Sequence, residues 1–238
     1  MPTQMEWKRR IDRFIEQLES RLFTPLGDVD LAMARTFDEI PLEACDGLDF
    51  GPAPVGTPWG LQWEYAWFRG RLALPDGPIP PDLALRPGTG PDSVVYVDGH
   101  PCGALDRFHD TVDLGWLAGD PAREADLRAG VDLRIATYAG HGERNGHVGP
   151  VPPDTVTVRP VTGPQRTVGP SRLGRFHEDR YQLLVDVRTL REAHDTLPKE
   201  TLRSEDLFGA LCTFTMTVDL ELDGDDLDES CRACRAAL

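Results

Sequence analysis

The sequence predicts an α+β fold in which an antiparallel β-sandwich lies between an N-terminal helix and a C-terminal helical region. Near the N-terminus, apolar residues recur every three or four positions, which is typical of an amphipathic helix. From about Glu64 the period shortens to two, and about six short segments bounded by Gly, Pro or Asp follow without helical patterns between them. The helical period then returns. These changes divide the chain into a helix over 1–24, a sandwich with a leading loop over 25–168, and a helical linker over 169–238.

The N-terminal helix is expected over residues 5–22, because its apolar side chains fall on one face. They are Trp7, Ile11, Phe14, Ile15, Leu18 and Leu22. Residues 24–58 are rich in Pro, Gly and Asp, so we expect a long connecting loop with at most one short strand. In the next strand, Phe68 and Leu72 point to one face and Trp67 to the other. Further along, "VDGHP" (97–101) predicts a tight turn between two strands.

The C-terminal region begins with a helical stripe that ends at Pro198, and a second helix is expected from about Leu202. The segment "DLELDGDDLDES" (219–230) nearly fits a calcium loop, but Ser230 stands where the bidentate Glu is needed. We therefore interpret it as a solvated acidic linker. "CRACRAAL" (231–238) is a candidate further helix. Its Cys231 and Cys234 lack the second pair that zinc would need and are interpreted as free thiols.

Composition excludes some partners. The net charge of −15 argues against nucleic acid and against an anionic membrane, since both require a basic surface. No apolar stretch approaches the roughly 20 residues of a membrane span, and no secretory signal is visible at the start. The five cysteines are scattered, as reduced thiols would be. A cytoplasmic location is expected.

The stretch "PWGLQWEYAWFRGRLALP" (58–75) holds three of the five tryptophans. It can be a strand packed in the core, an aromatic platform for a sugar, or part of a pocket, because aromatic side chains serve in all three. Apolar residues on both of its faces favour a strand that is buried on both sides.

The remaining motifs predict no catalytic residue and no metal site. "HGERNGHVGP" (141–150) has two histidines six positions apart, but zinc needs three or four converging ligands, and a loop is the preferred interpretation. No nucleophile elbow, P-loop or dinucleotide fingerprint occurs.

Four blocks occur in an order that resembles the N-terminal region of the α-mannosidases of glycoside hydrolase family 38, above all the vacuolar and cytosolic branch with its bacterial relatives. The blocks are "PWGLQWEYAWFRGRLALP", "VVYVDGHPCGALDRFH", "YAGHGERNGHVGP" and "GRFHEDRYQLLVDVRTLREAHDTLPKETLRSEDLFGAL". The resemblance implies a leading helix, a β-sandwich of the jelly-roll, galactose-binding-like kind and a helical linker, followed by a zinc-dependent catalytic domain. The family's zinc-binding H-x-D-x-x-W stretch is absent from this sequence. The resemblance therefore implies a non-catalytic region with no cofactor of its own, whose partner is the catalytic domain that carries the zinc.

Three hypotheses follow. The chain is a non-catalytic accessory region of an α-mannosidase, with a structural role and a capacity to bind mannosides; alternatively it is a free-standing carbohydrate-binding module, or a small complete enzyme. A homo-oligomer is compatible with each of them. The candidate sugar-binding residues are three aromatic side chains, Trp59, Trp63 and Trp116, and three polar ones, Asp106, His109 and His141. We expect the loops near Trp59, Asp106–His109 and His141–His147 to lie at one end of the sandwich, because loops at one end commonly carry binding.

Overall fold

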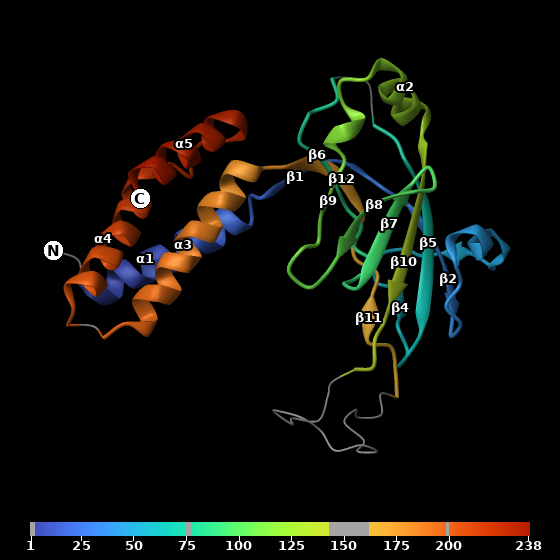
Figure 1. Ribbon diagram of the computed structural model, residues 1–238, viewed down its shortest axis with the longest axis horizontal. Helices are drawn as coiled ribbons and strands as arrows, with labels where there is room; N and C mark the ends of the chain where they lie inside the picture. Colours follow the sequence, from blue (N-terminus) through green and yellow to red (C-terminus); the bar gives the residue numbers. More distant parts are fainter. Residues whose placement is uncertain (1–2, 75–77, 143–161, 199) are drawn as a thin grey trace. The chain divides into compact units, whose positions relative to one another are not determined.

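The computed structural model describes residues 3–74, 78–142, 162–198 and 200–238 (Figure 1). The chain forms two compact units. A helical unit combines the residues up to Thr24 with Phe176–Leu238, and a β-unit comprises Pro25–Arg175.

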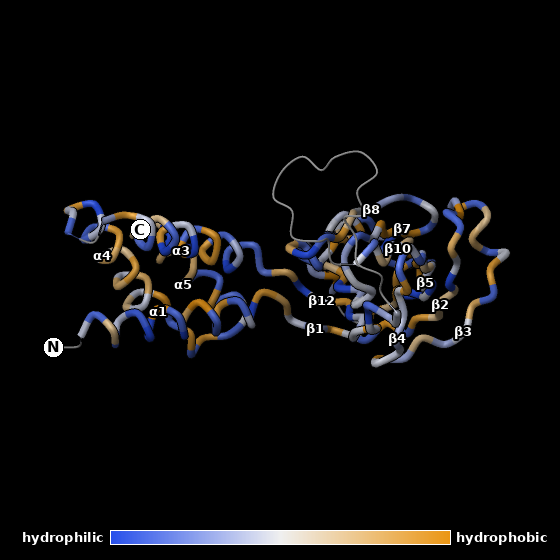
Figure 2. Tube along the Cα trace, turned by 90° about the horizontal axis from the view of Figure 1, so that it is seen from below, coloured by the Kyte–Doolittle hydropathy of each residue, from blue (hydrophilic) through white to orange (hydrophobic). Residues whose placement is uncertain are grey.

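The described part of the helical unit contains four helices, α1 (Gln4–Glu19), α3 (Glu178–Thr196), α4 (Leu202–Thr217) and α5 (Gly224–Ala237). The helix α1 begins with a capping box, in which the Thr3 hydroxyl accepts from the Glu6 amide and the Glu6 carboxylate accepts from the Thr3 amide. The helices pack around one apolar cluster, where Phe14 meets Phe214 edge to face at 6.0 Å. The alternation of apolar and polar residues along these helices can be followed in Figure 2. The helices predicted near the N-terminus and from Leu202 are confirmed.

The predicted acidic linker over 219–230 is wrong for most of its length, because α5 already begins at Gly224. Leu227, Cys231 and Cys234 follow at steps of four and three and are fully buried. Together they form the apolar stripe of α5. The candidate helix over 231–238 is confirmed as the second half of α5, and only the start of that helix lies earlier than expected.

In its described residues, the β-unit is built from two larger antiparallel sheets. The six-stranded sheet has the order β3 (Gly51–Pro52), β2 (Leu31–Thr36), β5 (Tyr65–Leu72), β10 (Val131–Tyr138), β7 (Ser93–Val97) and β8 (His100–Leu105). The four-stranded sheet has the order β1 (Phe23–Asp28), β12 (Arg172–Phe176), β6 (Leu83–Arg86) and β9 (Val112–Asp113). A third, two-stranded sheet pairs β11 (Arg166–Thr167) with β4 (Pro58–Trp59). Inward side chains of both larger sheets form one core, which supports the predicted sandwich-like arrangement.

The hairpin β7–β8 confirms the predicted turn. Asp98 and Gly99 connect the strands with φ values of 47° and 76°. Two successive residues with positive φ are typical of the two-residue turns that match the twist of a hairpin.

Two expectations fail in the β-unit. Residues 24–58 are not one long loop: they contain β2, most of β1 and a 3₁₀ helix (Leu42–Gly47). Both strands have six residues, and β1 contains Pro, Gly and Asp. The strand β2 is held by its pairing with β5, which begins at Tyr65, far along the chain from the end of β2 at Thr36. The sandwich also contains a helix, α2 (Pro121–Ala129), which begins with an Asp120 cap and a proline in its first turn. Among the described residues, no helix is long and apolar enough to cross a membrane.

Candidate functional site

The two tryptophans at the start of the aromatic stretch have opposite environments. Trp59 is fully buried and packs edge to face on Phe68, with ring centroids 5.7 Å apart. Its ring belongs to the core and is not presented to a ligand. Trp63 is 48% exposed and lies 5.7 Å from the His141 ring. The backbone of Trp63 adopts φ 69° and donates its amide hydrogen to the Gly140 carbonyl, which ties this loop to the end of β10.

Asp106 and His109 lie in the exposed loop that follows β8. The Asp106 carboxylate accepts hydrogen bonds from His109 Nδ1 at 3.0 Å and from the Phe108 and His109 amides at 2.7 and 2.8 Å. These bonds, first among them the one from the His109 ring, lower the pKa of Asp106 to about 2. The carboxylate is therefore ionised at neutral pH and organises its own loop.

Strand register shows which of these loops share an end of the sheet. Leu105, Ser93 and Thr137 are aligned across β8, β7 and β10, and Tyr138 is aligned with Tyr65. The loops of Trp63, His141, Asp106 and His109 therefore leave the six-stranded sheet at the same end. Residues 143–161, which include His147, lie outside the described residues.

Trp116 lies apart from the others. It is 42% exposed, and the Arg123 guanidinium of α2 lies 5.3 Å from its ring centroid. Because α2 leads directly into the start of β10, Trp116 belongs to the opposite end of the β-unit. The structure thus brings the loops of Trp63, His141, Asp106 and His109 to one end of the sheet, whereas Trp116 lies at the other end. Trp59 is withdrawn from any ligand by its burial in the core.

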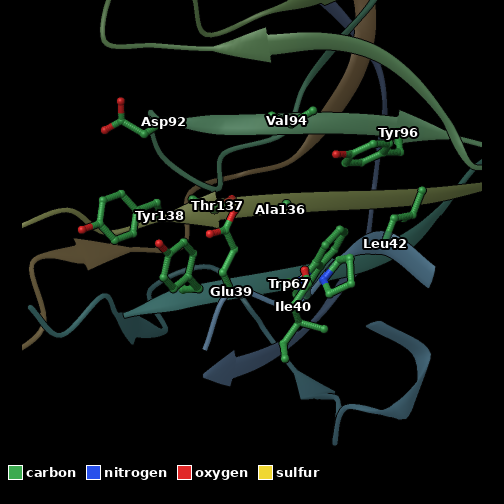
Figure 3. A pocket seen from close by; sticks show the side chains of 13 residues that line it. Glu39, Ile40, Leu42, Trp67, Asp92, Val94, Tyr96, Ala136, Thr137 and Tyr138 are labelled. Atoms are coloured by element: carbon green, nitrogen blue, oxygen red, sulfur yellow. Dashed lines mark hydrogen bonds between the residues drawn. The ribbon is translucent and has the colours of Figure 1, made fainter. Parts of the chain in front are cut away.

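A cleft that the sequence did not reveal lies on the outer face of the six-stranded sheet. It has a volume of about 400 Å³ and is lined by outward side chains of β5, β10 and β7 and by the segment 39–42 (Figure 3). The size falls within the range of small-molecule sites, about 300–1,000 Å³. Its lining residues are Glu39, Ile40, Pro41, Leu42, Tyr65, Ala66, Trp67, Asp92, Val94, Tyr96, Ala136, Thr137 and Tyr138. We call this space the sheet-face cleft.

Aromatic pairs form the walls of the sheet-face cleft. Tyr65 and Tyr138 stack with centroids 4.7 Å apart, and Trp67 and Tyr96 are tilted by 31° at 6.0 Å. Trp67 is nearly buried, and its Nε1 donates a hydrogen bond of 3.1 Å to the Ile40 carbonyl, which fixes the segment 39–42 over the sheet. Burial raises the pKa of the Tyr138 hydroxyl, and the neighbouring Tyr65 adds to this rise.

The burial of Trp67, Phe68 and Leu72 confirms the interpretation of their stretch as a strand with apolar contacts on both faces. The cover on the outer face comes from the segment 39–42, which lies within the predicted connecting loop over 24–58. Tyr138, which stacks on Tyr65, comes from β10, a strand far along the chain from β5. Only the register of β5 with β10 brings it beside Tyr65.

The CxxC motif lies on α5, as free thiols, which confirms the prediction. We call Cys231 and Cys234 the α5 cysteine pair. Burial raises the pKa of Cys231 to about 12 and that of Cys234 to about 11, so both remain thiols at neutral pH. Among the described residues, no group of three or more His, Cys, Asp and Glu side chains could hold a metal ion. The zinc that the resemblance implies therefore has no fitting ligand set in the described part of this chain.

Comparison with known proteins relates the chain to part of a mannosidase. Its sequence is 25% identical to alpha-mannosidase 2C1 of Mus musculus over 221 residues, which are 89% of this chain and 20% of that protein. It is 26% identical to alpha-mannosidase 2C1 of Homo sapiens over 233 residues, or 92% of this chain and 21% of that protein. The chain thus spans about a fifth of the length of these relatives. No family model matches the sequence.

Proposed function

We propose that this chain is the non-catalytic N-terminal β-sandwich region of an α-mannosidase, in which another part of the protein hydrolyses α-mannosides. The observation that carries this proposal is the similarity to alpha-mannosidase 2C1 over 89–92% of the chain. The unmatched remainder is smaller than either compact unit, so both units take part in the similarity. The order of the four sequence blocks, which resembles glycoside hydrolase family 38, supports the same assignment.

In this proposal the role of the chain is assembly: its two units pack with a catalytic domain that supplies the zinc. The mannosidase would act in the cytoplasm, in line with the resemblance to the cytosolic branch. Among the described residues, no group of three or more His, Cys, Asp and Glu side chains could hold that zinc.

The direct test is an activity assay of the purified 238-residue chain with an aryl α-mannoside, with zinc and with a chelator. We expect no hydrolysis under either condition. Turnover that the chelator abolishes would refute the proposal, because it would place a complete metal-dependent site within these residues.

Carbohydrate binding is a second candidate function, and it would also suit a free-standing module. The observation that favours it is the grouping of Trp63, His141, Asp106 and His109 at one end of the sheet. Loops at one end of a rigid scaffold commonly carry binding. The test is a titration with mannose and mannobiose. Binding that Trp63→Ala abolishes would place the site at this loop end, and a flat titration would reject the function.

A further inference from the structure

We propose that the sheet-face cleft is a binding site for a neutral pyranose sugar. The proposal rests on the second candidate function, carbohydrate binding, but places the sugar in the sheet-face cleft and not at the loops of Trp63 and His141. It does not depend on the relation to mannosidases. It is carried by the shape of the cleft, by its aromatic walls and by the charge of its lining.

The shape follows from one small residue on the sheet. Tyr138, Ala136 and Arg134 are successive outward positions of β10, and Ala136 is aligned with Trp67 on one side and Val94 on the other. In Figure 3, Ala136 lies between Tyr138 at one end of the cleft and Trp67 and Tyr96 at the other. The methyl group leaves a hollow between tall aromatic side chains, which a larger residue at this position would fill.

The walls suit a sugar ring. The Tyr65, Tyr138 and Tyr96 side chains are only partly buried, so their rings and hydroxyls retain accessible surface. An aromatic ring offers a flat apolar face with a negative quadrupole, against which the C–H bonds of a pyranose pack favourably. Tyrosine adds a hydroxyl that exchanges hydrogen bonds with the hydroxyl groups of the ligand.

The charge of the lining selects a neutral ligand. Two carboxylates, Glu39 and Asp92, lie at the cleft, and no Lys, Arg or His is among its lining residues in the described part of the chain. Carboxylates accept hydrogen bonds from sugar hydroxyls and repel anions. A phosphate, a sulfated sugar or an acidic peptide would be disfavoured.

The position on the sheet disfavours an extended peptide. The cleft lies over β5, β10 and β7, which are central strands of the six-stranded sheet. Their backbone groups already pair on both sides, so a peptide cannot add a strand there. A ligand that stacks on rings and bonds to side chains is the occupant that this surface fits.

The experiment titrates the ¹⁵N-labelled 238-residue chain with α-mannobiose, cellobiose, lactose and N-acetylglucosamine, followed by NMR. We expect at least one of these sugars to shift the amide signals of the sheet-face cleft. In Ala136→Leu, the added side chain should raise the Kd at least about tenfold, equivalent to about 1.4 kcal/mol. The matched control is Ala125→Leu, which makes the same change at an exposed position of α2, at the opposite end of the β-unit from the loops of Trp63 and His141, and should leave the Kd unchanged.

A second variant, Tyr138→Ala, removes a wall instead of filling the hollow and should weaken binding to a similar extent. The melting temperature of each variant shows that loss of binding is not loss of fold. Binding that is lost in Trp63→Ala but kept in both cleft variants would overturn this inference and leave the loop-end candidate standing. No binding of any of the four sugars would overturn both, and leave the proposed mannosidase region untouched.

Discussion

The buried charge network of the helical unit gives the sharpest stability prediction. Asp228 on α5 accepts a hydrogen bond of 2.6 Å from Arg180 Nε and one of 2.9 Å from His177 Nδ1. Arg180 also donates to the Arg21 and Gly224 carbonyls, both at 2.8 Å. The side chains of Arg180 and Asp228 are only 4% and 13% exposed.

The perturbation is Asp228→Ala. It removes the carboxylate and leaves the Arg180 guanidinium buried with carbonyl partners but no counter-charge. Removing one partner of a buried ion pair costs about 3–5 kcal/mol. We expect the free energy of unfolding of the helical unit to fall by about this amount. Because much of the loss comes from the orphaned charge, the double variant Asp228→Ala/Arg180→Met should lose less than Asp228→Ala alone.

The assay is urea denaturation followed by circular dichroism, together with the reactivity of the α5 cysteine pair towards a thiol reagent. The pair is fully buried in the helical unit, so its labelling reports the opening of that unit separately from the β-unit. The matched control is Glu229→Ala, an exposed position on the same helix, which should change the stability by less than about 0.5 kcal/mol. The reasoning is refuted if Asp228→Ala destabilises the unit no more than this control does.

Three further predictions follow from burial and pKa. In the folded protein, the α5 cysteine pair should resist alkylation at pH 8, because burial raises the pKa of both thiols and leaves little of the reactive thiolate. Rapid labelling of the pair before the protein unfolds would contradict this. Trp59→Ala should lower the free energy of unfolding by about 3–5 kcal/mol, as large-to-small changes in a core do. Trp63→Ala, at a half-exposed position, should lower it by less than about 1 kcal/mol. Equal losses of stability in thermal unfolding would contradict the placement of Trp59 in the core. The pKa of Asp106 is lowered to about 2, so its stabilising contribution is present above pH 3.8 and is lost as the pH falls towards 2; an NMR titration midpoint near 3.8 would contradict this.

The parts of the fold that the sequence predicted are those with strong local periodicity. The helix α1 and the strand β5 carry regular apolar patterns, and the β7–β8 turn has its Asp-Gly signal. The strand β2 could not be predicted, because its six residues owe their conformation to pairing with β5. The start of α5 was missed because an acidic first turn concealed a stripe that contains two cysteines.

The candidate site was harder to predict because it depends on register. The loops of Asp106, His109 and His141 share an end of the sheet, as expected, but Trp59 is buried and His147 lies outside the described residues. The sheet-face cleft needs Tyr65 beside Tyr138 and Trp67 beside Ala136, and these pairings join residues far apart in the chain. A sequence shows which face of one strand a residue occupies, but not which residue of another strand stands next to it.

Reading the native coding sequence downstream of the Leu238 codon tests whether these residues are the non-catalytic region of an α-mannosidase. If they are, the reading frame continues into an H-x-D-x-x-W stretch, the zinc-binding signature that these 238 residues lack. A stop codon directly after Leu238 would contradict the proposed function and favour carbohydrate binding by a free-standing module.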